Sequence, residues 1–238
     1  MTEKPGGRAM VLAAGYGQRM RPLTLTRPKP LIEVAGKPLI AYGFDRLRAA
    51  GVATAVVNVH YLAGQIEAWA SAQAAPQILI SDERAELLDT GGGIARALPL
   101  LGDAPFFVIN SDSFWLEEGE PALARLIEAW DGQQMDCLLL LSPLARTVGY
   151  EGAGDFVLDA DGRLARRAAA PGAALAYAGG YLVAPRLFRG APPGKFSMNL
   201  LWDRAIAAGR LFGLEHKGRW LHVGEPSAIA LAEQALRA

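Results

Sequence analysis

Hydrophobic and polar positions alternate along the first 142 residues in blocks whose lengths suit strands and helices. Short apolar runs bounded by turn residues predict strands at 9–14, 53–59, 77–80, 105–109 and 136–141. Segments with helical periodicity lie between these runs, at 39–50, 62–74, 93–100 and 121–130. Such alternation implies right-handed crossovers and a mainly parallel sheet with helices on both faces.

The pattern changes after residue 142. Strand candidates at 155–158 and 176–183 are separated by glycines, which predicts a smaller mixed or antiparallel half. A helix at 198–208, a strand at 211–215 and a closing helix at 226–236 follow. No repeat or long polar linker divides the chain. We therefore predict a Rossmann-like three-layer α/β/α fold with a mixed sheet, in one domain spanning residues 1–238.

Composition narrows the range of functions. The chain is 51% hydrophobic and its 24 basic side chains balance 24 acidic ones, so no global positive field favours nucleic acid or an anionic membrane. The single cysteine, Cys137, excludes an internal disulfide and suits a reducing compartment. Residues 1–8 are polar and no run approaches the ~18 apolar residues of a membrane span. We expect a cytoplasmic protein in which a local cluster of residues, and not the overall charge, holds any phosphate ligand.

A basic, glycine-bearing string follows the first predicted strand. It reads LAAGYGQRMRPLT from Leu12 to Thr24, and PKPL follows at residues 28–31. Glycines let backbone amides approach a polyphosphate, and Arg19 and Lys29 can neutralise phosphate charge. A third glycine of a dinucleotide fingerprint is missing at Met20, and no GxxxxGK[ST] string occurs. Taken alone, Gly15 and Gly17 are explained equally well by a tight turn with solvated arginines as by phosphate binding.

These strings, together with GKPLI at residues 36–40, resemble the sugar-1-phosphate nucleotidyltransferases. The resemblance covers nearly the whole chain, and its motifs are most specific in the first 40 residues. It implies that Arg19 contacts the leaving pyrophosphate and Lys29 the phosphates at the reacting centre, as catalytic residues. It also implies a nucleotide-binding half up to about residue 142 and a sugar-phosphate-binding half from about 143 to 238. The nucleotide-binding residues that it implies are Leu12, Ala13, Ala14, Gly15, Gly17, Gln18, Arg19, Asp89, Gly91 and Gly92.

Open α/β sheets bind ligands at the carboxyl ends of their strands, so we expect metal ligands there. Asp112 follows the apolar run 106–109 and is a candidate ligand for Mg²⁺, although an aspartate there can also cap a turn. The resemblance places a second ligand, usually aspartate, where His222 stands in WLHVG. Magnesium prefers oxygen, so direct ligation, contact through water or phosphate, and a structural role all stay open for His222.

Base and sugar contacts are less distinct. The resemblance implies that the TGGG string at 90–93 reads the base, but glycine runs before helices also permit close packing. The usual acceptor-side Glu-Lys-Pro string is absent, and Arg166 and Arg167 stand near its expected place. The string from Tyr177 to Tyr181 resembles an Asn-x-Gly strand of the family, but Tyr177 stands in place of the asparagine. The sugar-side candidates are Asn110, Asp155 and Gly179.

The resemblance implies transfer of a nucleotidyl group from a nucleoside triphosphate to a sugar 1-phosphate, with release of pyrophosphate. Within the family, the compact length, the GDF string at 154–156 and the TGGG loop are most similar to bacterial uridylyltransferases that act on N-acetylmuramate 1-phosphate in cell-wall recycling, which favours UTP. Mannose-1-phosphate guanylyltransferases are the alternative. A non-catalytic nucleotide sensor and a glycosyltransferase are alternatives of other classes, and a homo-oligomer is compatible with the sequence.

Overall fold

A nine-stranded mixed sheet forms the centre of the molecule in a computed structural model that describes residues 5–237. Residues 1–4, which belong to the polar N-terminal stretch expected to lack a signal, lie outside the described residues. The strands of this sheet are β1 (Arg8–Leu12), β4 (Thr54–Val59), β5 (Gln77–Asp82), β6 (Phe106–Asn110), β8 (Cys137–Pro143), β10 (Phe156–Leu158), β11 (Leu164–Arg166), β12 (Ala174–Val183) and β13 (Leu211–Glu215). The order is β11-β10-β12-β6-β1-β4-β5, with β8 between β12 and β13.

Parallel pairing joins β1 to β4 and β6, and β4 to β5, as the first part of the chain predicts. Antiparallel pairing begins at β12, which pairs with β6, β8 and β10. The register of β12 on β8 shifts between Tyr177 and Tyr181, because a bulge there contains Gly179 at φ 81°. The predicted mixed character of the second half is confirmed, and strands from both halves share one sheet.

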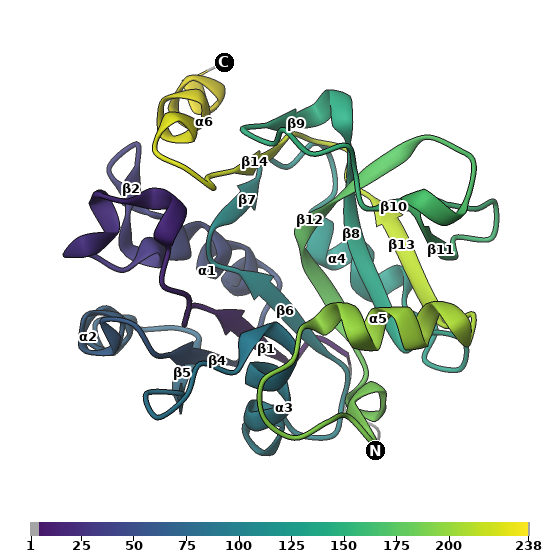
Figure 1. Cartoon of the computed structure of the whole chain (residues 1–238), viewed down its shortest axis with the longest axis horizontal. Coiled ribbons are helices and arrows are strands. Elements are labelled where there is room, and N and C mark those ends of the chain that lie inside the picture. Colours follow the sequence, from purple (N-terminus) through teal and green to yellow (C-terminus); the bar gives the residue numbers. More distant parts are fainter. Residues whose placement is uncertain (1–4, 238) are drawn as a thin grey trace.

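Helices cover both faces of the sheet, which confirms the three-layer prediction. The helices α1 (Leu39–Ala49), α2 (Ala63–Ser71) and α4 (Ala122–Ala129) pack on one face. The helices α3 (Asp89–Leu101) and α5 (Met198–Ala207) pack on the other. Figure 1 shows α5 in front of the sheet and α4 behind it. Strands β1 and β6 are buried on both faces, which is why they read as apolar runs rather than alternating patterns.

A smaller sheet stands beside the main one. It consists of β7 (Ser113–Trp115), β14 (Trp220–His222) and β9 (Thr147–Val148), and the hairpin of β2 (Glu33–Val34) and β3 (Lys37–Pro38) lies nearby. The helix α6 (Ser227–Arg237) packs against β2, β9 and β14 and closes a third apolar cluster. These strands of two or three residues were not predicted, because so short a run carries no periodic signal.

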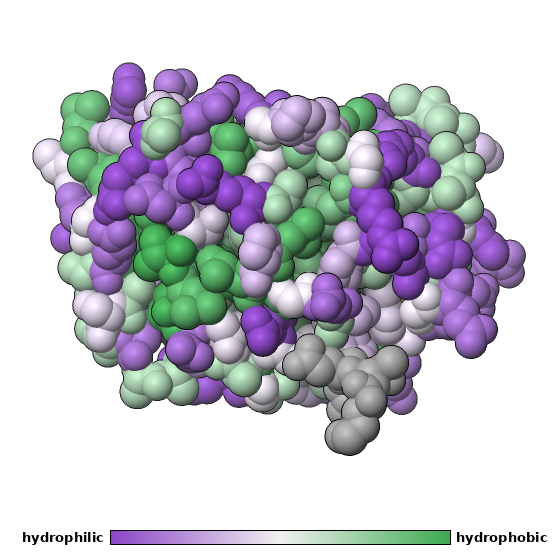
Figure 2. Space-filling view, turned by 90° about the horizontal axis from the view of Figure 1, so that it is seen from below, coloured by the Kyte–Doolittle hydropathy of each residue, from purple (hydrophilic) through white to green (hydrophobic). Residues whose placement is uncertain are grey.

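The surface mixes hydrophobic and hydrophilic residues. Figure 2 shows, on the face seen from below, an area of hydrophobic residues bordered by hydrophilic ones. A chain this rich in apolar residues leaves some of them at the surface, so such an area is ordinary. Among residues 5–237, no helix is both long and apolar enough to cross a membrane. Cys137 is fully buried in β8, as expected of an inert thiol.

Candidate active site

The glycine-bearing string forms a tight loop at the carboxyl end of β1. Gly17 has φ 62° and precedes a short 3-10 helix at Gln18–Met20. A Cβ at Gly17 would lie 3.0 Å from Cβ of Lys29 and 2.9 Å from Cγ2 of Thr24. The Thr24 hydroxyl donates to the Gly17 carbonyl at 2.8 Å. Glycine at position 17 therefore serves both the left-handed turn and the close approach of the segment that carries Lys29.

Lys29 and Asp112 meet at the centre of this edge of the sheet. Lys29 begins a 3-10 helix at Lys29–Leu31 and is only 8% exposed. Its Nζ lies 2.9 Å from Oδ2 of Asp112, whose side chain is 28% exposed. Burial alone would raise the pKa of the Asp112 carboxyl, but the charges of Lys29 and Arg19 hold it below its ordinary value. Asp112 is therefore an ionised group that is paired with Lys29 and lies near the charge of Arg19.

Arg19 and His222 complete this cluster. Strand β14 pairs with β7 so that His222 lies opposite Ser113, and the amide of Val223 donates to the Asp112 carbonyl at 3.1 Å. A Cβ at Gly224 would lie 2.6 Å from Nε2 of His222 and 3.3 Å from Nη1 of Arg19. Burial lowers the pKa of His222, and Asp112 opposes this shift. The imidazole is thus held neutral beside the cations.

One cleft of about 540 Å³ contains most of the residues that the sequence singles out. Its lining includes the predicted residues Leu12, Ala13, Ala14, Gly15, Gly17, Gln18, Arg19, Lys29, Asp89, Asn110 and Asp112. It also includes Tyr16, Pro30, Thr90 and Gly224, which belong to the quoted strings but were not named as site residues, and Leu87, Ser111 and Lys195, which no motif indicates. The structure therefore brings the basic loop, the PKPL lysine and the strand-end aspartate into one shared cleft.

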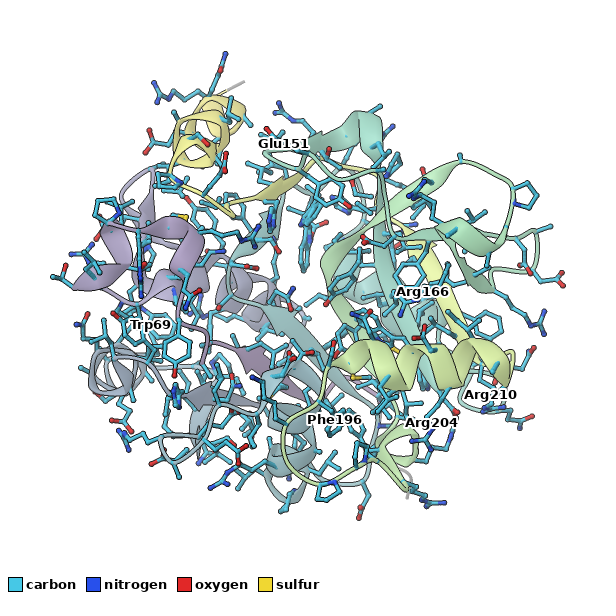
Figure 3. All side chains as sticks on the ribbon, viewed as in Figure 1. Trp69, Glu151, Arg166, Phe196, Arg204 and Arg210 are labelled. Atoms are coloured by element: carbon cyan, nitrogen blue, oxygen red, sulfur yellow. The ribbon has the colours of Figure 1, made fainter. Side chains whose placement is uncertain are left out.

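Gly91 and Gly92 lie within a helix and not before it. The predicted helix at 93–100 begins four residues earlier, at Asp89, so both glycines lie within α3. Their amides donate to the Phe196 carbonyl at 2.9 and 3.0 Å. A Cβ at Gly91 would overlap the Phe196 ring, and one at Gly92 would overlap the Gly194 carbonyl. Figure 3 shows Phe196 beside α3, on the segment that leads into α5. These glycines permit close packing, and their contact with nucleotide stays a prediction.

Asp155 and Gly179 lie outside the lining of the cleft. Oδ2 of Asp155 accepts a hydrogen bond from the Tyr177 amide at 2.9 Å, so this carboxylate supports β12 beside its bulge. A Cβ at Gly179 would overlap Oγ of Ser113 and lie 3.4 Å from Cβ of Asn110. Their predicted contact with substrate stays a prediction, as does that of His222 with a metal.

A second cavity of about 210 Å³ adjoins the cleft, because Leu12, Asp89, Thr90 and Asn110 line both. Its remaining lining comes from β12 and from the start of α5: Tyr177, Tyr181, Ser197, Met198, Asn199 and Trp202. The rings of Tyr177 and Trp202 lie 5.0 Å apart, and those of Tyr181 and Trp202 lie 5.6 Å apart.

Three polar atoms of these aromatic residues are buried, and no described residue gives them a hydrogen-bond partner: the hydroxyls of Tyr177 and Tyr181 and Nε1 of Trp202. Buried polar groups normally find partners, so these three atoms are exceptions, and they lie behind the wall of the cavity rather than on its surface. Sequence reasoning noticed Tyr177 only as a lost asparagine and missed the other two.

The donor set near Asp112 suits a metal that is shared with a substrate. Among the described residues, no group of three or more histidine, cysteine, aspartate or glutamate side chains could form a metal site. Mg²⁺ usually takes one or two protein carboxylates and completes its shell with water and substrate phosphates. Asp112, at the edge of a cationic cleft, fits that arrangement, and a cage made only of protein does not.

Comparison with known proteins agrees with this geometry. The sequence profile described as "Nucleotidyl transferase" matches residues 8–150. The chain is 48% identical over 232 residues to an N-acetylmuramate alpha-1-phosphate uridylyltransferase of Caulobacter vibrioides, covering 96% of each chain. It is 37% identical to a protein of that name from Neisseria meningitidis, covering 91% of this chain and 93% of the relative. A crystal structure of UDP-glucose pyrophosphorylase with UDP-glucose superposes with a TM-score of 0.79 at 19% identity, covering 100% and 99% of the two chains.

The fold, and the cleft in which Arg19 and Lys29 lie near Asp112 at one edge of the sheet, are those of a nucleotidyltransferase. The chain belongs to the nucleotidyl transferase family, as the profile and the two relatives show. Its activity is that of a sugar-1-phosphate nucleotidyltransferase, which joins a nucleotidyl group to a sugar 1-phosphate and releases pyrophosphate.

Proposed function

We propose that this enzyme transfers a uridylyl group from UTP to N-acetylmuramate 1-phosphate, which would give it a role in cell-wall recycling. The observation that carries the proposal is the joining of a cationic cleft to an aromatic cavity. The relatives at 48% and 37% identity, each covered over more than nine tenths of its own length, are both named N-acetylmuramate alpha-1-phosphate uridylyltransferase, which supports the choice. A mannose-1-phosphate guanylyltransferase subunit of Danio rerio also matches 92% of this chain, but at 30% identity and over only 61% of its own length.

The cleft and the cavity divide the substrates between them. We assign the phosphates of UTP to the loop at Ala13–Arg19 and to Lys29, and the base to the wall at Leu87–Thr90. The sugar enters the aromatic cavity, where the ring faces suit a pyranose and the lining residues Ser197 and Asn199 suit its polar substituents. Asn110 lies on the shared wall between the two sites. Nucleotide is thus bound mainly by residues up to about 142 and sugar mainly by residues 143–238.

The reaction is a single in-line displacement. An oxygen of the sugar 1-phosphate forms a bond to the α-phosphorus of UTP as the bond between that phosphorus and the pyrophosphate oxygen breaks. Lys29 and Arg19 neutralise the charge that gathers at the reacting phosphates. Lys29 is anchored by Asp112 and is almost buried, so its ammonium stays in place.

Asp112 would hold Mg²⁺ together with phosphate oxygens of the substrates. When bound, the ion supplies further neutralisation of phosphate charge and helps to orient the two substrates. Asp112 itself is ionised without it, since Lys29 and Arg19 keep the pKa of its carboxyl low. No side-chain nucleophile is required.

The test is a matrix of UTP, GTP, CTP, ATP and dTTP against several sugar 1-phosphates, with pyrophosphate release as the readout and metal omission as the control. The proposal expects the highest kcat/KM for UTP with N-acetylmuramate 1-phosphate. A preference for GTP with mannose 1-phosphate would make the enzyme a guanylyltransferase instead. Nucleotide binding without pyrophosphate release from any pair would indicate a sensor.

A further inference from the structure

Two buried polar residues outside the substrate-lining set connect the walls of the cleft. Asn58 near the end of β4 is 3% exposed, and Glu83 just after β5 is 1% exposed. The amide of Ala13 donates to Oδ1 of Asn58 at 2.7 Å, and Nδ2 of Asn58 donates to Oε1 of Glu83 at 2.7 Å. The amide of Leu88 donates to Oε2 of Glu83 at 3.0 Å. A continuous hydrogen-bonded line therefore runs from the glycine-bearing loop to the start of α3.

A second connection joins Tyr16, further along that loop, to Glu83. The Tyr16 hydroxyl lies 2.9 Å from Nε2 of His60, and Nδ1 of His60 lies 2.7 Å from the Glu83 carbonyl. A carbonyl only accepts, so Nδ1 carries the proton and Nε2 accepts from Tyr16. Both ends of the segment Ala13–Tyr16 are thus fixed to position 83 through polar residues at the end of β4.

The chemistry of Glu83 suits this task. Its two oxygens accept from two different donors, and among residues 5–237 no cation forms a salt bridge with it. A buried carboxylate is costly unless hydrogen bonds satisfy it, and here both of its oxygens are used. A Cβ at Gly93 would lie 2.6 Å from Oε1 of Glu83 and 3.0 Å from Nδ2 of Asn58. The third glycine of the TGGG string therefore makes room for this network.

We propose that Asn58 and Glu83 are positioning residues that set the distance between the phosphate-binding loop and the nucleotide wall at the start of α3. They act through the amides of Ala13 and Leu88. Ala13 lines the cleft, as do Leu87 and Asp89 on either side of Leu88. The inference rests on the nucleotide-binding role assigned to this cleft, and it does not depend on which base or sugar is used. Its consequence is selective: disturbing the network weakens nucleotide binding and leaves sugar-phosphate binding nearly unchanged.

The test exchanges the amide of Asn58 with the carboxylate of Glu83. In Asn58→Asp, two carboxylates face each other and a donor is lost. In Glu83→Gln, an amide group faces a donor and only one oxygen is left to accept. In the double variant, the aspartate at position 58 still accepts from Ala13. The glutamine at position 83 donates to that aspartate, and its oxygen accepts from Leu88. The double variant therefore keeps all three hydrogen bonds and one carboxylate, and differs from the wild type only in that position 83 donates to position 58.

Each single variant should raise KM for the nucleoside triphosphate roughly tenfold, with KM for the sugar phosphate within about twofold of wild type. The double variant should return to within about threefold of wild type. Glu128→Gln, at an exposed position on α4, is the matched control and should change neither constant. Tyr16→Phe, on the exposed loop, removes the second connection without threatening the fold and should raise the nucleotide KM about threefold.

The outcomes separate the inference from the proposed function. Single variants with a wild-type nucleotide KM, equal rises of both KM values, or a double variant no better than its worse parent would each overturn the inference. If a single variant is too unstable to assay, a folded double variant with wild-type constants supports it and a double variant that also fails to fold contradicts it. A wild-type protein that releases no pyrophosphate with any pair defeats the proposed function instead.

Discussion

The two ends of the joined cavities are built in opposite ways. At the end to which we assign the phosphates, Lys29 forms an ion pair with Asp112, and Arg19 adds a second positive charge nearby. At the other end, Tyr177, Tyr181 and Trp202 leave buried polar atoms without partners among the described residues. Phosphates require compensating charge in fixed positions, whereas a sugar requires ring faces and free hydrogen-bonding groups. The contrast indicates that turnover depends on the first end and substrate choice on the second.

Removing Lys29 should produce the largest effect. Lys29→Ala takes away the nearly buried cation that we assign to the reacting phosphates, so kcat should fall roughly 10²-fold or more. Steady-state pyrophosphate release measures it, with thermal unfolding as a check on the fold. Asp112→Asn should cause a loss of similar size.

Lys217→Ala is the matched control for that experiment, because Lys217 is exposed and belongs to neither cavity lining. Its kcat should equal that of the wild type. Near-normal turnover in Lys29→Ala would break the comparison, since the phosphate end would then not determine the rate.

The phosphate end could be predicted from the sequence because its parts are local. The strands are continuous apolar runs, and their polar ends carry the chemistry directly, as in the step from Phe106–Ile109 to Asp112. Glycines and cations follow the first strand within 20 residues. Parallel strands bring their carboxyl ends to one edge, so the meeting of Lys29 with Asp112 follows from topology.

The aromatic end could not be predicted in the same way. Tyr177 and Tyr181 lie on opposite sides of a bulge, and Trp202 comes from a helix that is brought beside them only by folding. The close packing of Gly91 and Gly92 against the segment around Phe196 joins residues about a hundred positions apart, which no local pattern indicates. Asn58 and Glu83 were also missed, since single polar residues at strand ends carry no motif.

Gly91→Ala probes the junction between the two ends. The added methyl group would meet the Phe196 ring and backbone, so the free energy of unfolding should fall by about 1–3 kcal/mol. Chemical denaturation measures the change, and Gly91→Ala with Phe196→Leu should recover part of it. Gly64→Ala is the control, because a Cβ at Gly64 meets nothing within 4 Å. A stable Gly91→Ala protein with impaired nucleotide binding would instead favour direct contact between Gly91 and nucleotide.

Tyr181→Phe tests the aromatic end with a smaller expected effect. The hydroxyl has no partner within the described protein, so its removal should leave the free energy of unfolding unchanged or higher by about 1 kcal/mol. If the sugar uses this hydroxyl, KM for the sugar phosphate should rise roughly tenfold while KM for UTP stays constant. Unchanged constants for both substrates would show that the sugar does not use this hydroxyl, and the assignment of the sugar to the aromatic cavity would lose this support.

The smallest effect is expected at His216, which belongs to neither cavity lining. This residue is 1% exposed, and its Nε2 lies 3.0 Å from the Leu116 carbonyl. Burial lowers the pKa of His216, while Glu117 opposes the shift and Arg125 and Arg46 add to it. Since the unfolded chain binds this proton more readily, stability is complete above about pH 6.5 and is lost as pH falls through the lower folded pKa.

The wild-type melting temperature should therefore fall between pH 7 and pH 5 by more than that of His216→Gln. Glutamine keeps a donor for Leu116 and does not titrate, so the difference between the two slopes isolates the imidazole. Turnover at pH 7 should be the same in both proteins, because His216 touches neither substrate site. Equal slopes would mean that other groups determine the acid sensitivity, and a loss of turnover at pH 7 would extend the active site beyond the two cavities.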